Sequence, residues 1–232
     1  MRYEIKFVLD PINLIEFKRW ITQTPIFRRS YPRRGIHSVY FDTSEMSSAR
    51  DNLAGIALRN KYRLRWYSDL GKPRPSSAAS PKFEIKSKQG RLGQKFYRIM
   101  TTIHARMIDE IDRTLLTNQV CEELESRQWR DLRVPASLLE AALLVEYERD
   151  YYVAPGGLRV TVDTEISFGD ILSNTHCNKI GHSVLTKAIA EFKFPPRSLH
   201  QAAEVMSTLP FYPVRSSKYL MGLSLFGHAI YI

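Results

Sequence analysis

The sequence has little cysteine: only Cys121 and Cys177 occur in 232 residues, far apart and with no second thiol near either. A disulfide framework or a thiolate zinc site needs paired or clustered cysteines. We therefore exclude both and interpret the two cysteines as packing residues. The six histidines are scattered, and we expect each to be structural or exposed.

Long apolar runs are also missing. No stretch reaches the eighteen or so uncharged apolar residues of a membrane-spanning helix, and the N-terminus enters charged, strand-like sequence without an apolar signal segment. We expect a cytoplasmic protein with no membrane span. Internal repeats and low-complexity tracts are lacking too, so residues 1–232 are predicted to form one globular domain.

Positive charge is abundant, and most of it lies in the first half of the chain. The formal net charge is +10; residues 1–100 hold 21 Lys and Arg against 8 Asp and Glu, whereas residues 101–232 hold 13 against 16. Such a surplus attracts anions. Charge alone does not distinguish nucleic acid, acidic lipid and polyphosphate.

Hydrophobic periodicity predicts a strand-rich chain with a few helices. Alternation with a period of two predicts strands at 3–7, 38–42, 61–67, 82–88, 144–153, 158–168 and 190–194. Proline, glycine and serine at 71–77 predict a loop. Helical spacing predicts helices at 12–22, with Asn13 as a candidate cap, at 103–132, at 199–208, and from 217 onward.

Five of these strands carry charged residues on one face and apolar residues on the other. The charged sets are Glu4 and Lys6; Arg63 and Arg65; Glu84, Lys86 and Lys88; Arg159, Asp163 and Glu165; and Glu191 and Lys193. For any one strand, a face wetted by solvent is the simplest interpretation. The recurrence in five strands instead favours a common charged interior.

A barrel with this charged face inward would bring many cations together, and bound anions would relieve their repulsion. Arginine grips phosphate oxygens bidentately and lysine acts as a point charge. Glutamate can approach phosphate only through a divalent cation, and an oxygen-bound Mg²⁺ or Mn²⁺ suits that role. The expected ligands are therefore a polyphosphate and a divalent metal.

An ordered set of motifs also resembles a known family. The segments are Tyr3–Phe7, Ser38–Thr43, Lys61–Tyr67, Phe83–Lys86, Glu148–Tyr152, Leu158–Thr164, Glu191–Phe194 and Ser216–Tyr219. In order and over nearly the whole chain, they resemble the VTC domain of polyphosphate polymerases, a branch of the CYTH-like triphosphate tunnel metalloenzymes. The resemblance implies an α+β fold, a closed or nearly closed antiparallel β-barrel with helices packed outside.

The resemblance also implies roles for individual residues. It assigns phosphate binding to Lys6, Arg63, Arg65, Lys86, Arg149, Arg159, Lys193 and Lys218, with Lys6, Arg63, Arg65 and Lys86 catalytic. Glu191 is the best metal ligand, with Glu4, Glu84 and Glu165 as weaker candidates. The implied activity is transfer of the ATP γ-phosphoryl group to a polyphosphate chain.

Three residues need separate comment. Arg149 is out of phase with Glu146, Glu148 and Asp150, so one set or the other faces inward, and we favour Arg149. Arg2 stands where the sister CYTH signature has its first glutamate, which argues against that branch. Ser217 is predicted to cap the last helix; it either holds a phosphate there or serves only as a helix start.

Other functions stay open at this point. A triphosphate hydrolase would use the same ligands, and a non-catalytic module would bind polyphosphate or nucleotide without turnover. A nucleic-acid-binding barrel is a third interpretation, with Trp66, Tyr67, Tyr151 and Tyr152 as base-stacking residues. These aromatics mostly alternate against the charges, so we expect no nucleic acid partner. No SPX-type regulatory domain is apparent, and oligomeric state is not predicted.

Overall fold

The computed structural model describes residues 2–70, 80–90, 92–105, 108, 112–125, 136–173 and 183–229. The loop predicted at 71–77, Cys177 and residues 126–132 of a predicted helix lie outside these ranges.

One antiparallel sheet contains all the named strands of this part of the chain. Its order is β1-β9-β7-β6-β2-β3-β4-β5, and β8 pairs with β7. The strands are β1 (Tyr3–Leu9), β2 (Arg28–Asp42), β3 (Leu58–Asp69), β4 (Lys82–Gln89), β5 (Leu92–Ile99), β6 (Glu140–Val153), β7 (Arg159–Asp170), β8 (Ser183–Leu185) and β9 (Ala188–Phe194). The predicted antiparallel sheet with helices is therefore confirmed.

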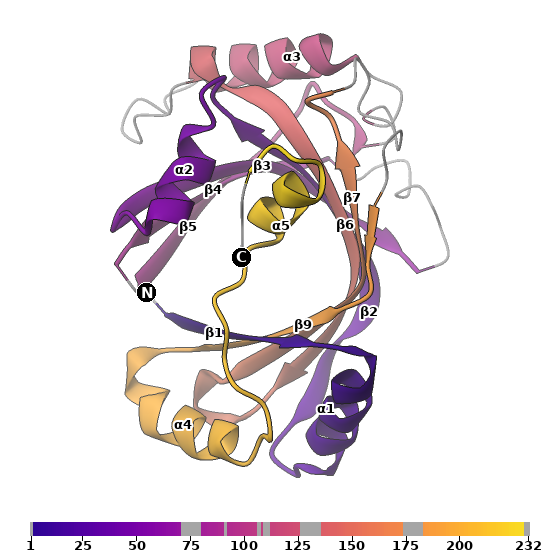
Figure 1. Ribbon diagram of the computed structural model, residues 1–232, viewed down its shortest axis with the longest axis vertical. Coiled ribbons are helices and arrows are strands. Elements are labelled where there is room, and N and C mark those ends of the chain that lie inside the picture. Colours follow the sequence, from indigo (N-terminus) through magenta and orange to yellow (C-terminus); the bar gives the residue numbers. More distant parts are fainter. Residues whose placement is uncertain are drawn as a thin grey trace.

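The sheet curves around a central space, with β1 and β9 across from β3 and β4 (Figure 1). Its two edge strands, β1 and β5, are joined by one isolated antiparallel bridge between Arg2 and Gly93. Within the described ranges no continuous hydrogen-bonded ladder joins these edges. Full closure of a barrel stays a prediction.

In the part of the chain that the structure describes, five α-helices accompany the sheet: α1 (Pro11–Gln23), α2 (Ser47–Ala54), α3 (Arg113–Glu125), α4 (Leu199–Ser207) and α5 (Lys218–Leu225). Helices α1 and α4 lie outside the curve beside β1 and β9, and α3 lies outside at the opposite end (Figure 1). None of the helices in the described ranges is long and apolar enough to cross a membrane.

Helix α5 differs from the expectation that all helices pack outside. Its residues Tyr219, Leu220 and Leu223 share a buried apolar cluster with Leu143 and Phe168 of β6 and β7. A Cβ at Gly222 would lie 2.5 Å from Leu143 Cδ2 and 2.6 Å from Phe168 Cδ1, so only glycine permits this approach. The helix therefore sits on the inner face of the sheet.

Several predicted elements differ in extent from those observed. The strand predicted at 38–42 is the end of β2, and α2 and β5 were not predicted. The helix predicted at 103–132 is observed as Arg113–Glu125. Asp10, rather than Asn13, caps α1, because its carboxylate accepts a hydrogen bond of 2.8 Å from the Asn13 backbone N–H.

Candidate functional site

The inner face of the sheet and the start of α5 enclose a pocket of about 1730 Å³, here called the inner pocket. Among the described residues, fourteen cationic and two acidic side chains line it. The acidic ones are Glu4 and Glu191. The cationic ones are Arg2, Lys6, Arg59, Lys61, Arg63, Arg65, Lys86, Lys88, Lys95, Arg149, Arg159, Lys193, Arg215 and Lys218.

Strand β3 supplies a row of four of these cations. Alternate residues of a strand share one face at about 7 Å spacing, and Arg59, Lys61, Arg63 and Arg65 all line the inner pocket. The sequence prediction included Arg63 and Arg65 and missed Arg59 and Lys61. The same alternation, extended toward the start of the strand, would have identified them.

Arg63 and Arg65 are held in place by protein groups. Arg63 Nε and Nη2 lie 2.8 and 2.7 Å from Glu84 Oε2, and Nη1 donates to the Tyr40 hydroxyl at 3.2 Å. Arg65 donates to Ser38 Oγ at 3.1 Å and to the Tyr147 hydroxyl at 3.0 Å. Such anchoring fixes the guanidinium groups before a ligand binds.

Glu84 is therefore the counter-ion of these arginines. Its side chain is 1% exposed, and its other carboxylate oxygen accepts from Lys95 Nζ at 2.5 Å. Burial alone would raise the pKa of Glu84, but Arg63 and Arg65 prevail and lower it to about 2. Glu84 is not among the residues that line the inner pocket, so its position does not suit the metal-ligand role predicted for it.

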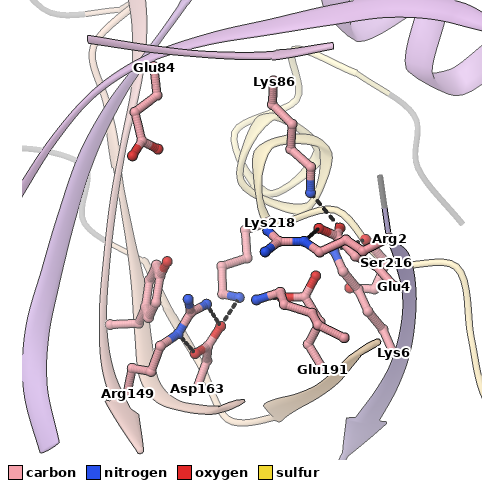
Figure 2. Close-up of polar contacts among 12 residues, drawn as sticks. Arg2, Glu4, Lys6, Glu84, Lys86, Arg149, Asp163, Glu191, Ser216 and Lys218 are labelled. Carbon is pink, nitrogen blue, oxygen red and sulfur yellow. Dashed lines mark hydrogen bonds and ion pairs between the residues drawn. The ribbon is translucent and has the colours of Figure 1, made fainter. Parts of the chain in front are cut away.

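A second cluster joins β6, β7 and α5 around Asp163. Arg149 Nε and Nη2 lie 2.5 and 2.7 Å from the two Asp163 carboxylate oxygens, and Lys218 Nζ donates to the same carboxylate (Figure 2). Asp163 is fully buried. Burial raises the pKa of its carboxyl group, and the two cations overcome this and hold it far below the usual range.

The structure also settles the phase of β6. Arg149 lines the inner pocket with Tyr147 and Tyr151, as the favoured interpretation predicted. Glu146 instead pairs with His37, whose two ring nitrogens lie 2.7 Å from Glu146 Oε1 and 2.8 Å from Ser68 Oγ. The sequence analysis placed Asp163 in a charged phase without assigning it a role.

The N-terminus of α5 opens into the inner pocket. Ser217 is the N-cap residue, as predicted, and its Oγ accepts a hydrogen bond from the Leu220 backbone N–H. Lys61 Nζ donates to that Oγ at 2.8 Å, and Lys6 Nζ donates to the Ser216 carbonyl at 2.9 Å. Burial lowers the pKa of Lys61 well below its ordinary value, and the nearby Lys6 lowers it further.

Glu4 and Glu191 are the two carboxylates that line the inner pocket. Antiparallel pairing sets Glu4 opposite Lys193 and Lys6 opposite Glu191, so the two acids are diagonal neighbours on one face (Figure 2). Lys86 Nζ lies 2.5 Å from Glu4, and Lys193 Nζ lies 2.8 Å from Glu191. Burial raises the pKa of Glu191, but Lys193 and Lys6 lower it well below its usual range. Glu191 is therefore ionised.

These two acids suit a metal that is shared with substrate. No group of three or more His, Cys, Asp or Glu that could hold a metal occurs within the described ranges. Mg²⁺, however, is commonly bound by one or two carboxylates together with water and substrate phosphates. Glu4 and Glu191 match that donor set.

Arg159 and Glu165 differ from the other predicted site residues. Arg159 lines the inner pocket but is exposed to solvent. Glu165 is exposed, has a φ of 50°, and is not among the lining residues. The register jumps from Glu146–Ser167 to Glu148–Thr164, which is a β-bulge that breaks the alternation of β7. The position of Glu165 therefore does not suit the metal-ligand role predicted for it.

Solved structures with a similar fold are distant in sequence. A putative adenylyl cyclase from Hippeastrum, described as having a dominant triphosphatase activity, has a TM-score of 0.55 at 15% identity, over 97% of this chain and 96% of that one. A Pyrococcus horikoshii protein has a TM-score of 0.52 at 13% identity, over 97% and 99%. A putative adenylate cyclase from Vibrio parahaemolyticus has 0.51 at 11% identity, over 94% and 97%.

At these identities the likenesses concern the fold alone. No curated protein matches the sequence. A family profile described as "VTC domain" matches residues 1–226, which is nearly the whole chain and includes every strand that forms the inner pocket. The chain therefore belongs to the VTC domain family.

Proposed function

We propose that the protein is a metal-dependent polyphosphate polymerase, which moves the γ-phosphoryl group of ATP onto a polyphosphate chain held in the inner pocket. The observation that carries this proposal is the charge balance of the pocket: among the described residues, fourteen cations line it with two acids, and even with the buried counter-ions Glu84 and Asp163 only four acids oppose the fourteen cations. That excess is unfavourable without a polyanion, because like charges repel more strongly where water is restricted.

The distribution of the cations favours a long anion. They follow β3 from Arg59 to Arg65, a span of about 20 Å. A single triphosphate would contact part of this row and leave the rest uncompensated. A nucleotide and a polyphosphate chain lying end to end would neutralise more of it, which favours synthesis over cleavage of a free triphosphate.

Lys6, Arg63, Arg65 and Lys86 are assigned to the reacting phosphates. In the transfer, a terminal oxygen of the chain attacks the γ-phosphorus, and the bond from that phosphorus to the β–γ bridging oxygen breaks. ADP leaves with the electron pair, and no proton transfer is required. The side chains contribute by alignment and charge neutralisation, as in other phosphoryl transfers.

Arg149, Arg159, Lys193 and Lys218 are assigned to binding the remaining phosphates, with Ser217 presenting the N-terminus of α5. Glu191, assisted by Glu4, would hold Mn²⁺ or Mg²⁺. When bound, such an ion neutralises charge on neighbouring phosphate oxygens.

Incubation of the purified protein with ATP and either Mn²⁺ or Mg²⁺ tests the proposal. We expect chains that stain as polyphosphate on a gel, together with ADP. Release of orthophosphate or pyrophosphate alone would overturn the polymerase assignment and support a triphosphate hydrolase, the activity named for the Hippeastrum relative. Tight ATP binding without turnover would indicate a non-catalytic module.

A further inference from the structure

One end of the inner pocket is lined by three tyrosines from three strands. Tyr31 comes from β2, Tyr67 from β3 and Tyr151 from β6, and together they are called the tyrosine cluster. The Tyr31 and Tyr151 rings meet edge to face, with centroids 5.7 Å apart. The cluster forms an aromatic end to an otherwise cationic pocket.

Arg34 holds the cluster in place. Its guanidinium carbon lies 4.6 Å from the ring centroid of Tyr67 and 5.1 Å from that of Tyr151. Its Nε also donates to the Tyr151 hydroxyl at 3.1 Å. Tyr31 nevertheless remains 61% exposed, although a large aromatic ring gains from burial. The exposed Tyr31 ring, held against the partly buried Tyr151, is suited to a planar ligand.

We propose that the tyrosine cluster stacks the base of the nucleoside triphosphate. The inference rests on the proposed function. It adds recognition of the base, which residues that bind only phosphate cannot provide. Stacking on aromatic rings accepts any base, because every base has a π-face. The Arg34 guanidinium, which lies over all three rings, reinforces such a platform through cation–π contacts.

Strand spacing separates the tyrosine cluster from the phosphate-binding arginines by a distance that suits a nucleoside triphosphate. Tyr67 follows Arg65 by two residues on β3, and Tyr151 follows Arg149 by two on β6, so each tyrosine lies about 7 Å beyond a cation on the same face. That separation leaves room for a ribose. A triphosphate held by Arg65 and Arg149 thus has its base at the cluster.

This arrangement gives the pocket a direction. At the other end of β3, Arg59 pairs in register with Lys88 of β4, and both line the inner pocket. The nucleotide would enter at the tyrosine cluster, and the polyphosphate chain would occupy the end formed by Arg59 and Lys88.

Calorimetric titration with ATP and with methyl triphosphate, which has the same phosphates but no base, tests the inference. We expect the wild-type protein to bind ATP about 5- to 100-fold more tightly than methyl triphosphate. Tyr31→Ala should remove most of that difference and leave methyl triphosphate affinity within twofold, which also shows that the variant is folded. Tyr31→Phe retains the ring and should bind both ligands like the wild type.

Equal affinity of the wild type for the two ligands, with no effect of Tyr31→Ala, would overturn base stacking while leaving triphosphate binding intact. Failure of the wild type to bind either ligand would overturn the proposed function as well. The two failures are therefore distinguishable in one set of titrations.

Discussion

Arg149 and Asp163 face each other across the β6–β7 pair and form a bidentate ion pair, with N–O distances of 2.5 and 2.7 Å. Asp163 is fully buried, and it also accepts a hydrogen bond from Lys218 at the start of α5. One carboxylate thus sets the positions of two cations that line the inner pocket. We infer that Asp163 positions phosphate ligands without contacting phosphate itself.

Asp163→Asn should destabilise the protein by about 3–5 kcal/mol, because it removes a fully buried counter-ion from two partly buried cations. Tripolyphosphate should restore part of this loss, since its charge replaces the carboxylate. Chemical denaturation with and without the ligand measures both effects.

Asp150→Asn is the matched control for that substitution. Asp150 is nearly buried on the neighbouring strand, but its arginine partners, Arg29 and Arg33, lie 3.9 Å away. Its replacement should cost about 1 kcal/mol or less, and tripolyphosphate should give it no extra stabilisation. Equal rescue of both variants would contradict a positioning role for Asp163.

Lys6→Ala and Arg65→Ala should each lower tripolyphosphate affinity about ten- to a hundredfold, because each removes a charge-assisted contact of roughly 1.5–3 kcal/mol. Arg19→Ala removes an equal charge from the exposed face of α1 and should leave affinity unchanged. Titration calorimetry makes the comparison. Similar small losses in all three variants would mean that net charge, not the inner pocket, attracts the ligand.

Anion binding should weaken as the pH rises above about 8. Burial lowers the pKa of Lys193 to about 8, although Glu191 partly opposes it. The empty pocket therefore loses this charge above pH 8, whereas a bound anion favours the protonated form. Tripolyphosphate binding at pH 9 should take up protons, which calorimetry in buffers of different ionisation enthalpy detects.

Lys193→Arg should remove much of that pH dependence, because arginine stays charged throughout the range. Lys61, Lys88 and Lys218 also line the pocket and have pKa values lowered by burial, so they account for the part that remains. The effect of the Lys193 titration on the free energy of unfolding has the opposite sign to its effect on anion binding. Between pH 8 and the ordinary lysine pKa of 10.5 the unfolded chain holds more protons than the native one, so Lys193 makes folding more favourable as pH rises. If Lys193→Arg binds tripolyphosphate with the same pH dependence as the wild type, Lys193 is not the group whose titration weakens binding.

Glu191→Gln should weaken Mn²⁺ binding in the presence of tripolyphosphate at least tenfold, because it removes an ionised oxygen ligand from the inner pocket. Electron paramagnetic resonance of Mn²⁺ measures the bound fraction without relying on activity. Glu165→Gln is the control, since Glu165 is exposed and outside the pocket. Comparable losses in the two variants would argue against a site at Glu191.

Period-two alternation predicted which residues share the pocket-lining face where a strand is regular. On β3 and β4 it identified Arg63, Arg65 and Lys86 as residues of one face, and all three line the inner pocket. It failed at Glu165, where a β-bulge shifts the alternation, because a bulge depends on pairing with a partner strand. It also gave no indication that α5 would lie on the inner face, since that position depends on Gly222 meeting Leu143 and Phe168.

The amino-acid sequence by itself determined the strand faces, the excess of cations in the first half of the chain and the family, because these follow from residue order alone. Only the tertiary structure decided which charges are available to a ligand. Glu84 and Asp163 are paired with arginines and lysines from other elements and do not line the inner pocket, whereas Glu4 and Glu191, although paired with Lys86 and Lys193, do line it. The pairings of Glu84 and Asp163 join residues 11 to 55 positions apart, and local periodicity cannot encode contacts between distant strands.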